Sequence, residues 1–267
     1  MADVDNDSPE LAAAYDRASD SQYESGLQLI ALMGICEGDH VLDVGCGTGR
    51  LALYVAGVVW PSGRVFGLDP SPHRVQVAGD KPGGPAAGNV AFGQGIAEEL
   101  GRFSDASFDA VYFNAVFHWV GDKKAALREA YRVLKPGGTV GITTGSRGGP
   151  STIRDVARAA FPQGPRRQGQ GAPRASMWLT KDELASLLGE AGFADVGVEQ
   201  RTAVKYFQSP GDYFRWLEAS APGRRTRAPG HVRAEIRRRM AEALEQRRTP
   251  EGIEIRSGRL LAIARRP

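Results

Sequence analysis

The sequence of 267 residues has only two cysteines, four histidines, and no apolar run near the ~20 residues that span a membrane. Cys36 and Cys46 do not have the spacing of metal ligands, so we predict neither a disulfide framework nor a metal site. Residues 1–7 are acidic, which is unlike a secretory signal peptide. We therefore expect a cytoplasmic protein that makes no membrane contact.

The composition is that of an ordinary globular protein, with 42% hydrophobic and 24% charged residues. A chain of this length predicts one large α/β domain or a domain with a cap. The net charge of +3 conceals an asymmetry, because the chain from Ala221 onward has thirteen arginines against five glutamates. Such a basic segment could bind phosphates or nucleic acid, or it could be a solvated helix face.

The basic segment contains an amphipathic pattern. Apolar residues recur every fourth position from 232 to 244, which predicts a helix over 231–248 with one buried stripe. Arg237, Arg238 and Arg239 then point largely outward. A solvated helix face accounts for these arginines without a nucleic-acid ligand.

A glycine-rich stretch follows the first apolar segment. Residues 41–44 are apolar except for Asp43. The next residues include Gly45, Gly47 and Gly49, and residues 51–56 then have helical periodicity. We predict a strand, a glycine turn and a helix. Glycine reaches positive φ without steric cost and lets a ligand approach the amides of a helix N-terminus, so the first hypothesis is a nucleotide-like ligand.

The spacing of the glycines argues against a dinucleotide. In Gly-x-Gly-x-x-Gly loops the backbone binds a pyrophosphate, whereas Gly49 comes one residue early. Asp43 would repel a pyrophosphate but could hold a cationic amino group. Asp69 ends the apolar segment 63–69 about 20 residues after the loop, where a carboxylate accepts hydrogen bonds from ribose hydroxyls. The alternative for Asp69 is an N-cap of a helix that begins near Pro72.

Five stretches in order resemble one family. Residues 41–50 are similar to motif I, (D/E)-x-G-x-G-x-G, of class I S-adenosylmethionine (SAM)-dependent methyltransferases, and Asp69 occupies the position of the family's second acid. Residues 95–100 resemble the stretch G-D-A-E-D-L, 107–120 the S-F-D-x-V…LHH/LHW signature, and 128–138 the R-x-L-K-P-G-G turn. The chain resembles the ubiquinone/menaquinone-type branch, methyltransferase type 11, over about residues 25–145.

The resemblance implies an α/β fold: a Rossmann-like seven-stranded sheet with helices on both faces and a helical substrate cap. It implies SAM as cofactor and S-adenosylhomocysteine as product. Ile96 replaces the Asp that accepts from the adenine amino group, so that hydrogen bond is absent or supplied by another group. The cofactor-binding residues that it implies are Tyr23, Asp43, Gly45, Cys46, Gly47, Gly49, Asp69, Pro70, Ile96, Ala97, Asn114 and Ala115.

Domain boundaries follow from the same resemblance. We expect an N-terminal helical lid over 1–34, whose Tyr15 or Tyr23 contacts the ligands or packs the helix onto the domain. The SAM-binding core then spans 35–149 and 179–208. The remaining expected segments are a cap insertion over 150–178, a helical cap insertion over 209–250 and a final core strand within 251–267.

The acceptor of the methyl group is less constrained. His118 is the best-placed general base, or else it shapes the cofactor pocket. The Asn/Asp-Pro-Pro-aromatic motif of nucleic-acid amino methyltransferases is missing at 114–117. We therefore expect a small, partly apolar metabolite, and not nucleic acid, as substrate. The expected substrate-pocket residues, which could also simply pin the cap to the core, are Tyr15, Trp119, Trp178, Tyr206, Tyr213, Phe214 and Trp216.

Two alternatives remain open at this point. A protein with this fold could bind SAM without methylating, as a cyclase or a scaffold. If the acceptor is anionic, for instance a diphosphate, the basic candidates in the cap are Arg166, Arg167, Arg174, Arg224, Arg225 and Arg227.

Overall fold

The computed structural model describes residues 7–82, 88–161, 177–220 and 230–267. Its centre is a sheet in the order β3-β2-β1-β4-β5-β8-β6, with the short β7 paired to β8. On this path β8 pairs antiparallel with both β5 and β6, and the other pairs are parallel. The path confirms the predicted seven-stranded Rossmann-like sheet. The strands are β1 His40–Val44, β2 Arg64–Asp69, β3 Val90–Gln94, β4 Phe108–Asn114, β5 Leu134–Gly145, β6 Ala194–Phe207, β7 Arg248–Thr249 and β8 Gly252–Arg265.

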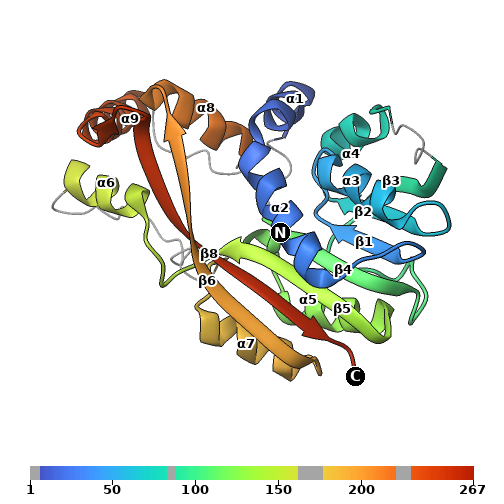
Figure 1. Cartoon of the computed structure of the whole chain (residues 1–267). Coiled ribbons are helices and arrows are strands. Elements are labelled where there is room, and N and C mark those ends of the chain that lie inside the picture. Colours follow the sequence, from blue (N-terminus) through green and yellow to red (C-terminus); the bar gives the residue numbers. More distant parts are fainter. Residues whose placement is uncertain (1–6, 83–87, 162–176, 221–229) are drawn as a thin grey trace.

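Helices cover both faces of the sheet (Figure 1). On one face, α2 (Asp20–Met33) and α3 (Arg50–Val59) bury Leu29, Ile30 and Val55 against the strands. On the other face, α5 (Lys123–Val133) and α7 (Lys181–Glu190) bury Leu127 and Leu184. Two apolar layers therefore fix the sheet. The remaining helices are α1 Pro9–Ala18, α4 Pro72–Gly79, α6 Thr152–Ala160, α8 Pro210–Ser220, α9 Gly230–Glu245 and the 3-10 turn η3 Phe117–Trp119.

The N-terminal helical segment is divided in two. Ser8 caps α1 as its sequence pattern indicates, and α2 ends at Gly34 with φ of 70°. The chain bends between them at Ser19, whose hydroxyl donates to the Asp16 carbonyl at 3.3 Å. Serine competes with the helical backbone for such bonds. The bend lets α1 pack against α8 of the cap and α4 of the core.

The last strand is longer than the apolar run 259–265 indicates. β8 begins at Gly252 and pairs with β6 from Ile253↔Phe207 to Arg265↔Ala194. The two strands extend together beyond the core sheet and carry α6, α8 and α9 at their far end (Figure 1). Ile253, Ile255 and Phe207 are buried there in a separate apolar cluster with Val156 and Leu244. Burial of this second cluster explains why the strands continue.

Helix α9 buries only part of its predicted stripe. Leu244 is fully buried, but Val232 and Ile236 are each 37% exposed. Arg237 pairs with Glu218, and Arg238 and Arg239 pair with Glu235. The arginines therefore form a solvated, ion-paired face. Within the described residues, no helix has the length and apolar character needed to cross a membrane.

Candidate active site

The glycine turn has the conformation that its sequence predicts. Gly45, Gly47 and Gly49 all have positive φ, of 79°, 54° and 76°. A Cβ atom at Gly45 would lie 2.3 Å from Cγ2 of Val116, and one at Gly47 would lie 3.2 Å from the Tyr15 ring. The loop therefore needs glycine both for its backbone angles and for the close approach of its neighbours.

Asp69 lies at the carboxyl end of β2 and holds the glycine loop. Its Oδ2 accepts from the Gly47 N–H at 2.9 Å, and its Oδ1 accepts from the Ser71 N–H at 2.9 Å. Burial is the main effect on its pKa and raises it, against the opposing charge of Arg74 and these two N–H groups. Ser71, not Asp69, caps α4. The N-cap alternative for Asp69 is therefore wrong.

Asp43 does not face a ligand. Its carboxylate is 2% exposed and accepts a hydrogen bond from the Tyr112 hydroxyl at 2.8 Å. Burial raises its pKa to about 8. The alternation of β1 turns this side chain away from the cavity into the sheet, so a direct contact with a cationic amino group, as the sequence suggests, is not what the structure shows.

Three further predicted cofactor residues also lie outside the cavity lining. Burial raises the pKa of the Cys46 thiol well above its usual range, which leaves it unreactive. Gly49 is needed for packing, because a Cβ there would lie 2.8 Å from both Ala78 and Phe92. Tyr23 packs edge-on against Tyr54 instead. Cys46 and Gly49 therefore belong to the packed side of the glycine loop, and Tyr23 belongs to the packing between α2 and α3.

A cavity of about 1160 Å³ opens at the carboxyl ends of the strands, beneath the cap. Ligands of open α/β sheets bind at this edge. The volume suffices for a nucleoside cofactor and a second small molecule. The predicted residues that line it are Tyr15, Gly45, Gly47, Asp69, Pro70, Ile96, Ala97, Asn114, Ala115, His118, Trp119, Trp178, Tyr213 and Trp216.

Two predicted pocket aromatics point elsewhere. Tyr206 is 46% exposed and its hydroxyl donates to Glu254, because alternate residues of β6 face opposite sides of the sheet. Phe214 packs against Tyr213 and lies under the guanidinium of Arg237. Tyr206 and Phe214 are therefore not pocket residues. The contacts of Phe214 join α8 to α9, both within the predicted cap segment, so they do not pin that segment to the core.

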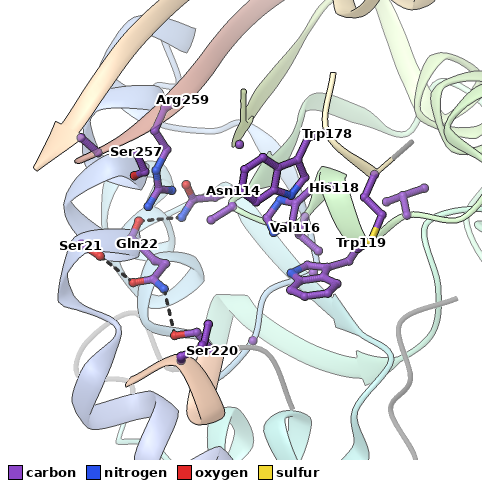
Figure 2. Close-up of a pocket in the computed structure, with 18 of the residues that line it drawn as sticks. Ser21, Gln22, Asn114, Val116, His118, Trp119, Trp178, Ser220, Ser257 and Arg259 are labelled. Atoms are coloured by element: carbon purple, nitrogen blue, oxygen red, sulfur yellow. Dashed lines mark hydrogen bonds between the residues drawn. The ribbon is translucent and has the colours of Figure 1, made fainter. Parts of the chain in front are cut away.

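His118 lies on the η3 turn that follows β4. Its Nδ1 is 3.3 Å from the Thr144 hydroxyl of β5, and its ring packs against Trp119. Figure 2 shows His118, Trp119 and Trp178 together on one side of the cavity, opposite Gln22 and Arg259. The imidazole is thus held in place at the wall of the cavity.

The lid and the cap meet over the cavity. Arg74 of α4 pairs with Asp7 at 2.8 Å and donates to the Ala219 carbonyl of α8 at 3.1 Å. Its guanidinium lies 4.3 Å from the centre of the Tyr15 ring. The Gln22 side chain of α2 donates to Ser220 at 3.5 Å (Figure 2). Contacts among α1, α2, α4 and α8 therefore surround part of the cavity.

Sequence reasoning missed the basic residues of the lining, among them Arg74, Lys205 and Arg259. Arg74 carries no signal beyond its place on a helix that follows Asp69. Lys205 enters the cavity because β6 and β8 extend past the core, which the apolar pattern does not reveal, whereas Arg259 lies at the edge of the core sheet, opposite Gly145 of β5. The six arginines proposed for an anionic acceptor, from Arg166 to Arg227, lie outside the described residues. In the described part of the chain, no group of three His, Cys, Asp or Glu side chains could hold a metal ion.

Comparison with known proteins agrees with the family resemblance of the sequence motifs. A family model described as a methyltransferase domain matches residues 42–142. The demethylmenaquinone methyltransferase of Geobacillus kaustophilus is 35% identical over 64% of this chain and 77% of its own length. The arsenite methyltransferase of Aquipseudomonas alcaligenes is 38% identical over 49% of this chain, and the chain spans only 38% of that protein.

Solved structures share the overall fold of this chain. The YcgJ protein of Bacillus subtilis superimposes with a TM-score of 0.63 at 20% identity, over 91% of this chain and 98% of that one. Similarity at this level of identity supports the architecture of sheet and helices described above.

Proposed function

The chain belongs to the class I SAM-dependent methyltransferases, and on that premise we propose that it transfers a methyl group from SAM to a small, partly apolar metabolite. The observation that carries the cofactor assignment is the Asp69 carboxylate fixed against the Gly47 amide at the floor of a large cavity. The relatives named for demethylmenaquinone and arsenite support a small acceptor.

The residues present fit SAM. Each Asp69 oxygen accepts one N–H bond and keeps capacity for a ribose hydroxyl. Gly45 and Gly47 line the cavity next to Asn114 and Ala115, where we place the methionine portion. Pro70, Ile96 and Ala97 offer an apolar surface for the adenine ring. Oε1 of Glu98 accepts from the Gly121 and Asp122 amides, and we assign the adenine contact to the backbone of Ile96–Ala97.

In such a reaction the protein mainly has to position the acceptor and SAM relative to each other. SAM supplies the activated methyl group when bound. Asn114 is itself held rigid, since it donates to the Gln22 carbonyl at 2.9 Å and accepts from the Thr143 hydroxyl at 2.7 Å. The Arg74 contacts keep α1 and α8 closed over the cavity and exclude water. Alignment and exclusion of water are the terms that an in-line transfer requires.

We propose His118 as the general base for an acceptor that must lose a proton, such as a hydroxyl. Its Nδ1 lies 3.3 Å from the Thr144 hydroxyl, and the imidazole lines the cavity. A base is needed only for such acceptors. An acceptor with a free lone pair would react without it.

We propose that the lid over 1–34 and the cap insertions over 150–178 and 209–250 select the acceptor, around a core of 35–149, 179–208 and the final strand. Trp119, Trp178, Tyr213 and Trp216 contribute aromatic surface to the described walls. A concave cavity with such walls suits a metabolite better than a folded macromolecule.

The test is to incubate the protein with methyl-labelled SAM and a library of small hydroxylated, carboxylated and aminated acceptors, and to analyse products by mass spectrometry. We expect a labelled product and its loss in Asp69→Ala. A protein that binds SAM and labels none of the acceptors would favour the non-methylating alternative, a cyclase or scaffold.

A further inference from the structure

The charged groups of the cavity wall are almost all neutralised. The acids Asp7, Asp69, Glu98 and Asp122 all accept hydrogen bonds. Six basic side chains of the lining bind carboxylates or backbone carbonyls: Arg74, Lys123, Lys124, Arg147, Arg154 and Arg256. Within the described residues, Lys205 and Arg259 are the two lining cations with neither a carboxylate nor a hydrogen-bond acceptor as partner.

These two cations come from neighbouring strands and face the same side. Lys205 of β6 is opposite Ile255 of β8, and Arg259 of β8 is opposite Arg201. Positions two apart along a strand share a face, so Lys205 and Arg259 point into the cavity across Ala203 and Ser257. Figure 2 shows Arg259 extending from β8 toward Asn114 and Gln22. Arg259 therefore lies beside the predicted methionine end of the cofactor site, and Lys205 lies further along the strand pair, beside Trp216.

Their surroundings are costly for unpaired charge. The Lys205 ammonium lies 4.4 Å from the centre of the Trp216 ring, a cation–π contact. Burial first, and then the nearby charge of Arg259, lower the pKa of Lys205 to about 8, against the opposing effect of Asp20 and Glu24. Burial also lowers the pKa of Arg259. A buried charge without a partner is unfavourable unless a ligand supplies one.

Directly opposite Arg259, Arg201 shows the contrasting arrangement. It binds Glu199 at 2.7 Å and donates to Gln28. It does not line the cavity. Arg201 and Arg259 are therefore directly opposite each other on β6 and β8. Arg201, which has a carboxylate partner, lies outside the cavity, and Arg259, which has none among the described residues, lines it.

We propose that Lys205 and Arg259 form an anion-binding subsite and that the methyl acceptor carries a carboxylate or phosphate group that binds there. A guanidinium and an ammonium converging from two strands suit an oxyanion, which the guanidinium can bind through two parallel N–H bonds. Ser257 between them offers a further hydroxyl donor. The inference deepens the proposed function and rests on it, since it names the chemistry of the acceptor.

The test uses inorganic phosphate and acetate as probes, titrated calorimetrically into the protein with and without S-adenosylhomocysteine. We expect saturable binding of at least one probe to the wild type. Arg259→Gln and Lys205→Gln should each weaken it at least ~tenfold, the size of one lost charged hydrogen bond. Arg259→Lys, which keeps the charge, should retain part of the affinity. Arg265→Gln, an exposed position on the same strand, and Lys181→Gln are the matched controls and should bind as the wild type does.

Affinity for S-adenosylhomocysteine separates this subsite from the cofactor site. We expect Arg259→Gln and Lys205→Gln to bind the product within about threefold of wild type, less than one lost hydrogen bond would cost. Loss of product affinity in Arg259→Gln would assign Arg259 to the cofactor carboxylate and overturn the subsite. The subsite would also be overturned if neither probe bound the wild type. It would be overturned as well if the wild type and the variant with both Lys205→Gln and Arg259→Gln bound the probes equally. A wild type that binds anions but not S-adenosylhomocysteine would contradict the proposed function instead.

Discussion

The Oδ2 atom of Asp69 accepts a hydrogen bond from the backbone N–H of Gly47 at 2.9 Å, which joins the end of β2 to the middle of the glycine turn. The carboxylate is thus aimed before any ligand binds. Its other oxygen is fixed by the Ser71 N–H. Preorganisation of this kind lowers the cost of ordering a site on binding.

Asp69→Ala should weaken SAM binding at least tenfold, because charged hydrogen bonds to two hydroxyls contribute ~1.5–3 kcal/mol each. Titration calorimetry measures the effect. Asp182→Ala, an exposed carboxylate on α7, should bind SAM as the wild type does. Wild-type affinity in the Asp69 variant would refute its role as anchor.

Gly45→Ala should destabilise the fold by roughly 1–3 kcal/mol and abolish SAM binding, since its Cβ would overlap the Val116 side chain at a positive φ. Gly57→Ala makes the matched comparison. Gly57 is exposed within α3 and has no atom within 4 Å of its added Cβ. That change should stabilise the protein by roughly 0.5–1 kcal/mol. Thermal melts with and without SAM distinguish the two, and equal behaviour would contradict the steric argument.

Asp43→Asn should stabilise the ligand-free protein increasingly as the pH rises. The folded-state pKa of Asp43 is raised to about 8, so the folded state holds a proton that the unfolded state releases near its ordinary pKa. This group therefore lowers the stability of the wild-type protein progressively as the pH rises from about 4 to about 8. The asparagine oxygen can still accept from Tyr112. A difference in melting temperature between variant and wild type that does not grow from pH 5 to pH 8 would contradict this account.

His118→Gln should lower the rate of transfer to a hydroxyl acceptor by ~10²-fold or more, the usual contribution of a general base. SAM affinity should stay near wild type. The pH dependence of kcat separates the roles, because a merely structural histidine would leave the shape of the wild-type profile in place. Thr144→Val, which removes the hydroxyl beside Nδ1, should produce a smaller loss of the same kind.

Local sequence signals predicted local structure well. The strand, glycine turn and helix predicted from residues 41–56 are confirmed by β1, by the positive φ of the three loop glycines and by α3, since each depends on neighbours within a few residues. The seven-stranded sheet also followed from the family resemblance. These features are fixed either by short-range hydrogen bonds or by a shared topology.

The direction of individual side chains was harder to predict. Asp43 and Tyr206 have suitable chemistry for a site, but strand alternation turns them away from the cavity. Lys205 lies on the part of β6 that pairs with β8 beyond the predicted strand, which starts at Arg259. Arg259 is in that predicted strand, but the apolar run does not show that its side chain lines the cavity. Long-range pairing of this sort leaves no mark in a single stretch of sequence.

The most direct test is a crystal structure of the protein with S-adenosylhomocysteine. The account predicts both ribose hydroxyls within hydrogen-bond distance of the Asp69 carboxylate, the adenine against Ile96 and Ala97, and the sulfur facing the space between His118 and Arg259. A bound product whose ribose does not contact Asp69, or one that lies outside this cavity, would contradict it.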